Sequence, residues 1–364
     1  MSETALVRAL ADGWVIEAQW VEYLPVGAGS YHWSAVDRHG TAWFVKADDL
    51  GVQAAECDDA FRRLGRSLST ALALKHDAGL DFVLAPVPAV TGAVVWRVTP
   101  RYALSVFPMI AGSAGQFGVH RPEYRAEVID LLAELHRATP VVADTALRTD
   151  LVLPGRDRLH EALRDLDQEW TGGPLAEPAR QLLAAHAGRI QEWLADFDRY
   201  VNTVRDTEAN WVVTHGEPHP GNIMRSPAGL WLIDWGTVQI APPERDLWML
   251  TTALADMLGQ EPDRRENNVL ARYTRVTGRI ATPAGITLYR MWWTLADIAI
   301  FVDELRRPHG TGEDIAAALT CLTGYLESSR DSHQWQRPAS GHAALPGSPP
   351  CRRPPPPAIP GGHC

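Results

Sequence analysis

The spacing of apolar residues divides the chain into a strand-rich part and a helical part. The strand-like runs, rich in aromatic and β-branched residues, lie at 14–26, 31–47, 82–98 and 101–110. A turn at 38–40 splits the second run into a hairpin, and residues 53–79 repeat apolar positions at helical spacing. The order of these elements predicts a small antiparallel sheet that carries one main helix.

Helical spacing dominates from about Arg121 onward. The segments with this spacing lie at 121–139, 155–170, 177–204, 241–258, 288–307 and 312–330. The chain beyond Asp331 is rich in proline and poor in apolar residues, so it cannot form a core. The pattern predicts an α+β fold with an N-terminal strand-rich lobe at 1–108, a helical lobe at 109–330 and a disordered tail at 331–364.

Composition narrows the classes of function. The chain has 364 residues and a formal net charge of -10, which argues against binding nucleic acid through phosphate contacts. The N-terminus lacks the pattern of a signal peptide, and no apolar run reaches membrane-spanning length. The four cysteines are scattered, as in proteins with reduced thiols. We expect a cytoplasmic monomer that binds a small molecule, without nucleic acid or membrane partners.

Two features of the strand-rich part are candidates for binding phosphate. Gly27, Gly29 and Ser30 lie between two strand-like runs, where glycines allow backbone N–H groups to approach phosphate oxygens, although hairpin turns are also glycine-rich. Lys46 lies in a half-buried strand, and Glu56 begins the following helix. A Lys–Glu pair that holds nucleotide phosphates is one interpretation, and a solvated strand lysine is the other.

The segment 211–236 is a strand, a polar loop and a second strand. His215, Glu217 and His219 have a spacing that could bind a metal, but prolines interrupt the strand, and a turn whose histidines bond backbone groups is the alternative. Asn222 adds a neutral oxygen ligand of the kind that hard cations accept. Asp234 ends an apolar run, where a carboxylate needs a cation or a capping role. One hairpin could bring Asn222 and Asp234 to a single Mg²⁺.

Taken in order, these features are the parts of a protein-kinase-like phosphoryl transferase. Over about residues 10–328 the chain resembles the aminoglycoside phosphotransferase family, on the segments HGEPHPGNIM, LIDWG and PPERDLW. It is most similar to the branch often labelled spectinomycin phosphotransferase, through YLPVGAGSYHW and WFVKADDL. The resemblance implies a bilobal protein-kinase-like fold that uses ATP, or GTP, together with Mg²⁺. In it, the lobe at 1–108 binds the nucleotide, and the helical lobe at 109–330 holds the catalytic loop and the acceptor site.

The resemblance also implies roles for individual residues. With the glycine-rich loop included, the nucleotide-binding residues are Gly27, Gly29, Ser30, Lys46, Glu56, Pro108, Met109 and Ile110, the last three in the hinge between the lobes. Asn222 and Asp234 match the metal-holding positions. His215 matches the histidine that supports the catalytic loop, and Asp246 matches the acidic residue that ties this loop to the next helix.

Glu217 departs from the family pattern, which has aspartate at this catalytic position. Glutamate keeps the carboxylate but extends its reach, and a misplacement of about 1 Å can lower a rate on the order of a hundredfold. Three interpretations remain open. The loop is rebuilt around glutamate in an active kinase, the enzyme acts on a different alcohol, or the chain binds nucleotide without turnover.

The acceptor site is expected in the helical lobe. Trp293 and Asp297 are four residues apart, so they share one helix face. Trp292 and Trp293 could form a wall for a sugar-like ring while Asp297 meets a cationic amine, and ordinary core packing is the alternative. Asp256 and Asp303 are further candidates.

Three classes of function therefore compete. The leading one is transfer of the γ-phosphoryl group of ATP to a hydroxyl of an aminoglycoside or aminocyclitol antibiotic such as spectinomycin, or to another small alcohol. In it, Glu217 accepts the hydroxyl proton and Lys46 neutralises phosphate charge. The second is a catalytically silent nucleotide-binding protein. The third is a metal-dependent hydrolase with His215, Glu217 and His219 as ligands, which the order of the motifs disfavours.

Overall fold

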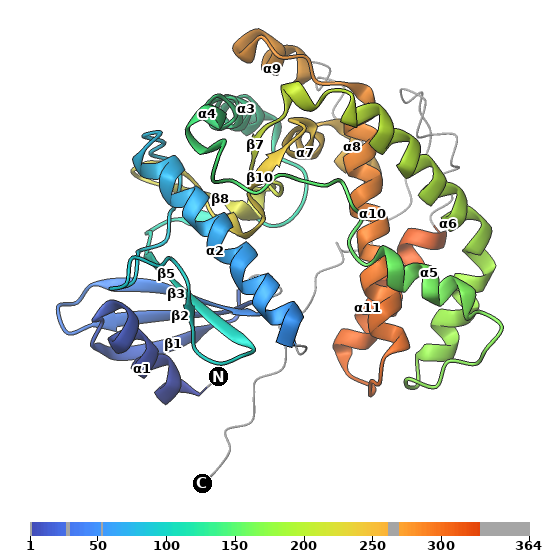
Figure 1. Ribbon diagram of the computed structural model, residues 1–364, viewed down its shortest axis with the longest axis horizontal. Helices are drawn as coiled ribbons and strands as arrows, with labels where there is room; N and C mark the ends of the chain where they lie inside the picture. The colour runs from blue at the N-terminus through green and yellow to red at the C-terminus, as the bar shows by residue number, and fades with distance from the viewer. Residues whose placement is uncertain (1, 27–29, 52–53, 261–268, 328–364) are drawn as a thin grey trace.

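An N-terminal sheet with its helices and a larger, mostly helical part make up the chain (Figure 1). The structure is a computed structural model that describes residues 2–26, 30–51, 54–260 and 269–327. The predicted tail at 331–364 lies outside the described residues. The lobe boundary placed at residue 108 stays a prediction.

The antiparallel sheet predicted from the alternating pattern is confirmed. Its strands are β1 (Ala18–Leu24), β2 (Ser30–Asp37), β3 (Ala42–Asp49), β4 (Trp96–Arg97) and β5 (Tyr102–Pro108), in the order β1-β2-β3-β5-β4. The main helix α2 (Ala54–His76) follows β3. The run at 82–98 forms only β4, because Pro86 and Pro88 have no N–H to donate to a ladder.

A helix that the pattern did not predict, α1 (Glu3–Trp14), packs on one face of the sheet. The Ser2 side chain accepts from the Ala5 N–H at 3.3 Å and caps the helix. Leu6 and Leu10 are buried together with Val45 of β3 in a small core. The opposite face of β3 carries Lys46, which lies between His32 of β2 and Ser105 of β5.

The helical part contains the segments predicted from the spacing of apolar residues. Its helices are α3 (Pro122–Arg137), α4 (Thr139–Val142), α5 (Arg156–Arg164), α6 (Ala176–Arg205), α7 (Glu244–Leu247), α8 (Thr252–Met257), α9 (Val269–Thr277), α10 (Pro283–Arg306) and α11 (Glu313–Glu327). The run expected to be one helix at 241–258 is interrupted at Thr251, which has an extended backbone and caps α8. Helix α10 packs against α5, α6 and α11.

Short strands in the helical part hold the polar loop. Strand β7 (Val212–Thr214) pairs with β10 (Gln239–Ala241), and β8 (Ile223–Ser226) forms a hairpin with β9 (Gly229–Leu232). Strand β6 (Ser113–Ala114) pairs with β8. The loop between β7 and β8 is thus fixed at both ends.

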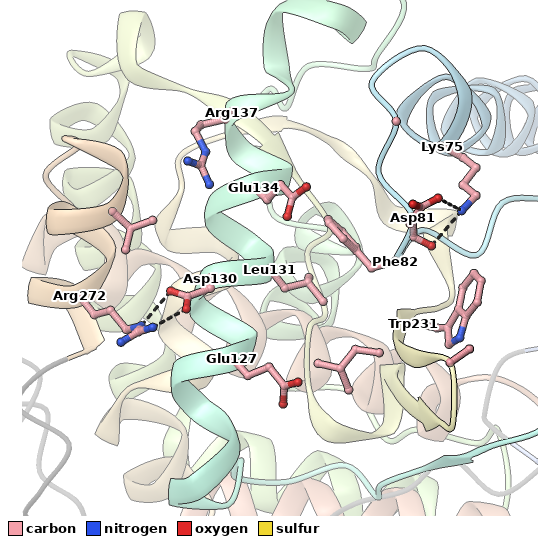
Figure 2. Close-up of a pocket in the computed structure, with 14 residues that line it drawn as sticks. Lys75, Asp81, Phe82, Glu127, Asp130, Leu131, Glu134, Arg137, Trp231 and Arg272 are labelled. Atoms are coloured by element: carbon pink, nitrogen blue, oxygen red, sulfur yellow. Dashed lines mark hydrogen bonds and ion pairs between the residues drawn. The ribbon is translucent and has the colours of Figure 1, made fainter.

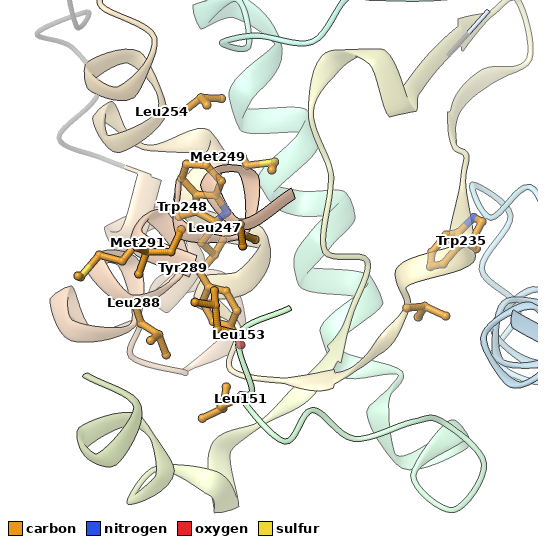
Figure 3. Close-up of a cluster of buried hydrophobic side chains, with 14 of the residues drawn as sticks. Leu151, Leu153, Trp235, Leu247, Trp248, Met249, Leu254, Leu288, Tyr289 and Met291 are labelled. Atoms are coloured by element: carbon orange, nitrogen blue, oxygen red, sulfur yellow. The ribbon is translucent and has the colours of Figure 1, made fainter. Parts of the chain in front are cut away.

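A continuous hydrophobic core underlies this loop and the helices around it. Figure 3 shows Trp248 and Met249 gathered with Leu288 and Met291 of α10, while Trp235 lies apart from them, in a segment that packs against α2. Full burial of each such side chain contributes about 1.5–3 kcal/mol. The loop therefore rests on a rigid, well-packed base.

None of the helices in the described part of the chain has the length and apolar character needed to cross a membrane.

Candidate active site

Buried polar side chains of the helical part hold the loop at 215–222 in place. The Asp246 carboxylate of α7 accepts the N–H groups of His215 at 2.9 Å and Gly216 at 2.5 Å. It also contacts His136 Nε2 at 3.0 Å. Burial alone would raise the pKa of Asp246, but His136 and Arg245 outweigh it and keep this pKa below its ordinary value. We call Asp246, Arg245 and His136 the catalytic-loop floor.

Arg245 explains why glycine is needed in the loop. Its guanidinium donates to Thr214 Oγ1 and to the Thr237 carbonyl, both at 2.9 Å. Gly216 has φ +102°, and a Cβ at this position would collide with the same guanidinium. Only glycine permits both the backbone conformation and the close approach.

The two loop histidines are engaged in local hydrogen bonds. His215 Nε2 donates to the Ile233 carbonyl at 2.8 Å, and its Nδ1 accepts from the Glu217 N–H at 3.2 Å. His219 Nδ1 accepts from the Gly221 N–H at 3.1 Å. Among the described residues, no group of three or more His, Cys, Asp or Glu side chains could hold a metal ion. This arrangement disfavours the hydrolase interpretation.

Glu217 projects from the loop, and its side chain is half-buried. Burial raises the pKa of Glu217 to about 7, and the negative charge of Asp234 adds to the rise. Arg245 and Lys46 oppose the shift, and the charge of Asp297 reinforces it. A carboxyl group with a pKa near neutrality, facing several charged groups, is typical of a catalytic acid or base.

Lys46 of β3 and Asp234 meet across the two parts of the chain. Lys46 Nζ lies 3.0 Å from Asp234 Oδ1, and their side chains are 14% and 48% exposed. The charge of Lys46 lowers the pKa of Asp234 to about 2. Asp234 has a left-handed backbone with φ 64°, a strained conformation that often marks functional sites. The carboxylate of Asp234 therefore contacts Lys46 of the sheet, and its side chain makes no capping hydrogen bond to the turn that follows.

The β8–β9 hairpin brings Asn222 to the same end as Asp234. Asn222 Nδ2 donates to the Glu217 carbonyl at 2.9 Å, and the Asn222 carbonyl accepts from the Ile233 N–H at 3.0 Å. The side-chain amide oxygen is thereby left as an acceptor. An amide oxygen and an ionised carboxylate fit the ligand preferences of a hard divalent cation.

The expected pair of Lys46 with Glu56 is wrong in this structure. Glu56 lies in the first turn of α2 with its side chain 51% exposed, 3.7 Å from Arg158 of α5. The second partner of Lys46 is Asp48 on the same strand, at 3.1 Å. Ser30, predicted to bind nucleotide, donates to Asp48 at 2.8 Å. The predicted Gly27 and Gly29 lie outside the described residues.

The predicted hinge follows β5 without a break. Pro108 pairs with Trp43 across the β3–β5 ladder, and the Met109 N–H donates to the Ala42 carbonyl at 3.2 Å. Since proline has no N–H, an adenine contact here would use the Ile110 N–H or the carbonyl oxygens. The adenine contact stays a prediction.

A half-buried group of side chains faces the loop from the helical part, and we call Phe117, Trp293, Asp297 and Tyr325 the acceptor side. Trp293 stacks on Phe117 with ring centroids 5.6 Å apart and an interplanar angle of 17°. Phe117 in turn meets the ring of His219 at 4.9 Å. Tyr325 of α11 donates to Asp297 Oδ2 at 2.7 Å. The structure thus brings the predicted Trp293 and Asp297 toward Glu217.

Other acceptor candidates are placed differently. Trp292 packs against the hydrophobic core, as Trp293 also does through its contact with Trp248, and no ring contact joins Trp292 to Phe117 among the described residues. Asp303 forms ion pairs with Arg158 at 3.0 Å and Arg307 at 2.8 Å, so its charge is already balanced. Asp256 is half-buried in α8.

Sequence reasoning missed His120, which holds the loop from the segment before α3. His120 Nε2 donates to the Pro218 carbonyl at 2.7 Å, and Arg125 donates to the His120 carbonyl at 3.1 Å. Burial lowers the pKa of His120 to about 4, so the ring is neutral at pH 7. Nothing in the local spacing of this histidine signals a contact 98 residues away.

A cavity of about 860 Å³ lies elsewhere, lined by residues of α2, α3, β9 and α9 (Figure 2). Its charged walls are partly neutralised, because Lys75 pairs with Asp81 at 3.0 Å and Arg272 pairs with Asp130. Its lining does not include Lys46 or the loop residues. The cavity is thus separate from the candidate active site.

Comparison with known proteins identifies the class. Residues 21–285 match the family described as the phosphotransferase enzyme family, so the chain belongs to this family. The recognition from the catalytic-loop segments and the assignment as a phosphotransferase are confirmed.

Individual relatives support the same fold. Protein StrN of Streptomyces griseus is 28% identical over 324 residues, which cover 86% of this chain and 88% of that protein. The crystal structure of a spectinomycin phosphotransferase in complex with ADP and spectinomycin has a TM-score of 0.63 at 15% identity, covering 89% of this chain and 94% of that chain. The structure of a microcompartment-associated aminopropanol kinase has a TM-score of 0.57 at 13% identity, covering 89% and 95%. The predicted bilobal, kinase-like α+β fold is confirmed.

Proposed function

We propose that the protein transfers the γ-phosphoryl group of ATP to a hydroxyl group of a small, amine-bearing molecule of the aminocyclitol or aminoglycoside class. The observation that carries this proposal is the half-buried Glu217 carboxyl, whose pKa is raised to about 7 beside the Lys46–Asp234 pair. A base with this pKa is ionised in a large fraction of molecules at neutral pH and accepts a proton efficiently.

Phosphate charge and a divalent cation have suitable partners in the site. Lys46 supplies a cation at the sheet, and Asp234 stays ionised because its pKa is lowered to about 2. Asp234 and the amide oxygen of Asn222 would hold Mg²⁺, which neutralises charge on the nucleotide phosphates when bound. The ADP complex of the spectinomycin phosphotransferase, which shares this fold, supports a nucleotide as donor.

The acceptor side supports a cationic, ring-shaped acceptor. The Asp297 carboxylate, held by Tyr325 at 2.7 Å, offers an ionic contact to an amine. The stacked rings of Phe117 and Trp293 offer an apolar wall next to it. Charged hydrogen bonds orient such ligands, and aromatic faces also attract cations.

In the proposed reaction, Glu217 acts as the general base. As its carboxylate takes the proton from the acceptor hydroxyl, the oxygen forms a bond to the γ-phosphorus, and the bond from this phosphorus to the leaving oxygen of ADP breaks. The catalytic-loop floor fixes the loop backbone, so the longer glutamate is presented from a rigid support.

A second candidate is a kinase for a small amino alcohol that is not an antibiotic. The similarity in fold to the aminopropanol kinase supports it. Such an acceptor would use Asp297 without needing the aromatic wall, so the two candidates differ in the effect of removing the Phe117 ring.

Measuring acceptor-dependent ADP formation with Mg²⁺ tests the proposal. The acceptors are spectinomycin, aminoglycosides, macrolides and amino alcohols, each with ATP and with GTP. The Glu217→Gln variant should lower kcat by about 10²- to 10⁴-fold while it still binds ATP. Glu217→Asp tests whether the loop needs the extra methylene.

Two results would count against the proposal. Full activity of Glu217→Gln would remove the base. ATP binding without turnover for every acceptor would favour the silent nucleotide-binding protein instead.

A further inference from the structure

One face of the sheet gathers polar side chains around Lys46. In antiparallel strands, residues directly opposite each other point to the same face. Ser30 is opposite Asp48, and Lys46 lies between His32 on β2 and Ser105 on β5. Since Lys46 and Asp48 are two residues apart on β3, they also share this face.

Asp48 is bound tightly on this face. Its Oδ1 accepts from Ser30 Oγ at 2.8 Å and lies 3.1 Å from Lys46 Nζ. Its side chain is 18% exposed, and its Oδ2 is buried without a hydrogen-bond partner. A buried carboxylate oxygen without a partner is unfavourable, so the position carries a cost that its contact with Lys46 must offset.

The acidic residues of α2 do not compete for Lys46. They pair with arginines: Glu56 with Arg158 at 3.7 Å, Asp58 with Arg97 at 2.5 Å, and Asp59 with Arg62 at 3.2 Å. Within the described residues, Asp48 and Asp234 are the carboxylates paired with Lys46. Asp234 is also the residue proposed to hold the metal, so its carboxylate would have to serve both the metal and Lys46.

We propose that Asp48, clamped by Ser30, is the positioning residue that aims the Lys46 ammonium at the nucleotide phosphates, in place of an acidic residue on α2. This inference rests on the proposed function. When Asp234 is engaged with a cation and Lys46 with phosphate, Asp48 still anchors the ammonium from its own strand. Because the anchor is on β3, the position of Lys46 does not depend on the position of α2.

Lysine labelling gives a direct test, because the chain contains two lysines, Lys46 and Lys75. Lys75 pairs with Asp81 in the separate cavity and serves as the internal reference. The reagent must reach the Lys46 nitrogen, whose side chain is only 14% exposed while Asp48 and Asp234 hold it. Asp48→Asn weakens one of these two contacts and should therefore label Lys46 about three- to tenfold faster, relative to Lys75, as measured by mass spectrometry.

Matched variants separate this effect from a general loss of structure. Asp49→Asn changes the adjacent residue, whose carboxylate is held by Arg101, and should leave the Lys46 rate within about twofold. Ser30→Ala keeps the Asp48 carboxylate but removes its clamp, and should give a smaller increase. If Asp48→Asn does not fold, the Ser30→Ala variant provides the test. An unchanged labelling rate of Lys46 in Ser30→Ala then overturns the proposal.

Kinetics with ATP give the second measurement. Asp48→Asn should lower kcat/KM for ATP by about tenfold and leave the acceptor KM within about twofold, because it misplaces Lys46 alone. If Asp48 had a purely structural role, its substitution would impair the use of ATP and of the acceptor together and would also lower thermal stability. The proposal is overturned if Asp48→Asn labels and turns over like the parent, or if Glu56→Gln produces these effects instead.

The labelling also separates this inference from the proposed function. In the parent, ATP with Mg²⁺ should protect Lys46 and not Lys75. Absence of protection would contradict the nucleotide site, whereas the faster labelling of Asp48→Asn without nucleotide depends only on the Asp48–Lys46 pair.

Discussion

The catalytic-loop floor and the acceptor side meet at Glu217 but are built differently. In the floor, Asp246 is fully buried, and its two oxygens accept two backbone N–H groups and contact a buried histidine. On the acceptor side, Asp297 and Tyr325 are half-buried and come from different helices. A buried network loses several bonds when one member is changed, whereas a half-exposed group regains water. Changes in the floor should therefore disturb folding and catalysis together, and changes on the acceptor side should alter binding.

The largest effect is expected from breaking the floor. Asp246→Asn removes the charge and places an amide NH₂ near the N–H groups of His215 and Gly216. We expect the free energy of unfolding to fall by about 2–4 kcal/mol, with a large loss of kcat. Urea unfolding at pH 7.5 measures this, with the exposed Asp144→Asn as the matched control. Equal stability of the two variants would mean that the floor does not hold the loop.

A smaller and more selective effect is expected on the acceptor side. Asp297→Asn keeps an oxygen for Tyr325 but removes the charge that would meet an amine. The KM for a cationic acceptor should rise about ten- to a hundredfold, since a hydrogen bond to a charged group contributes about 1.5–3 kcal/mol. The KM for ATP and the melting temperature should change little. Steady-state kinetics decide, and a matching rise in the KM for an uncharged acceptor would contradict the role of Asp297.

The pH dependence probes Glu217, where the two regions meet. Because burial and Asp234 raise the pKa of Glu217 to about 7, its base form increases with pH, and kcat/KM should rise about tenfold from pH 6 to pH 8. The folded state also holds this proton more tightly than the unfolded chain. Between the ordinary pKa of 4.5 and about 7, stability of the unliganded protein should therefore fall as pH rises.

The Glu217→Gln variant is the control for this pH dependence. It should flatten the dependence of stability, and its residual activity should no longer follow a group with a pKa near 7. An unchanged profile in the variant would assign the titration to another residue.

Whether a prediction from the sequence was right depends on how far apart the interacting residues lie along the chain. The helices and the sheet follow from apolar spacing, which is a local property. The loop residues His215, Glu217, Asn222 and Asp234 were found because a short hairpin and one loop bring them together. The pairing of Glu56 with Lys46 was wrong, because spacing places a residue on a helix but does not fix the rotation of that helix against the sheet.

Residues missed from the sequence share one property: their partners are distant along the chain. Phe117 meets Trp293, and Tyr325 meets Asp297, through the packing of α10 and α11 around the loop. His120 reaches Pro218 across 98 residues. Helix α1 was also missed, although its buried Leu6 and Leu10 are spaced as on one face of a helix.

The sequence by itself determined the class of protein, the order of its elements and the carboxylates that we propose to carry the chemistry, because these depend on local periodicity and on a contiguous loop. The tertiary structure alone decided which carboxylate holds Lys46, how far burial raises the pKa of Glu217, and which side chains face it. Those properties depend on desolvation and on contacts between distant segments, which exist only once the chain has packed.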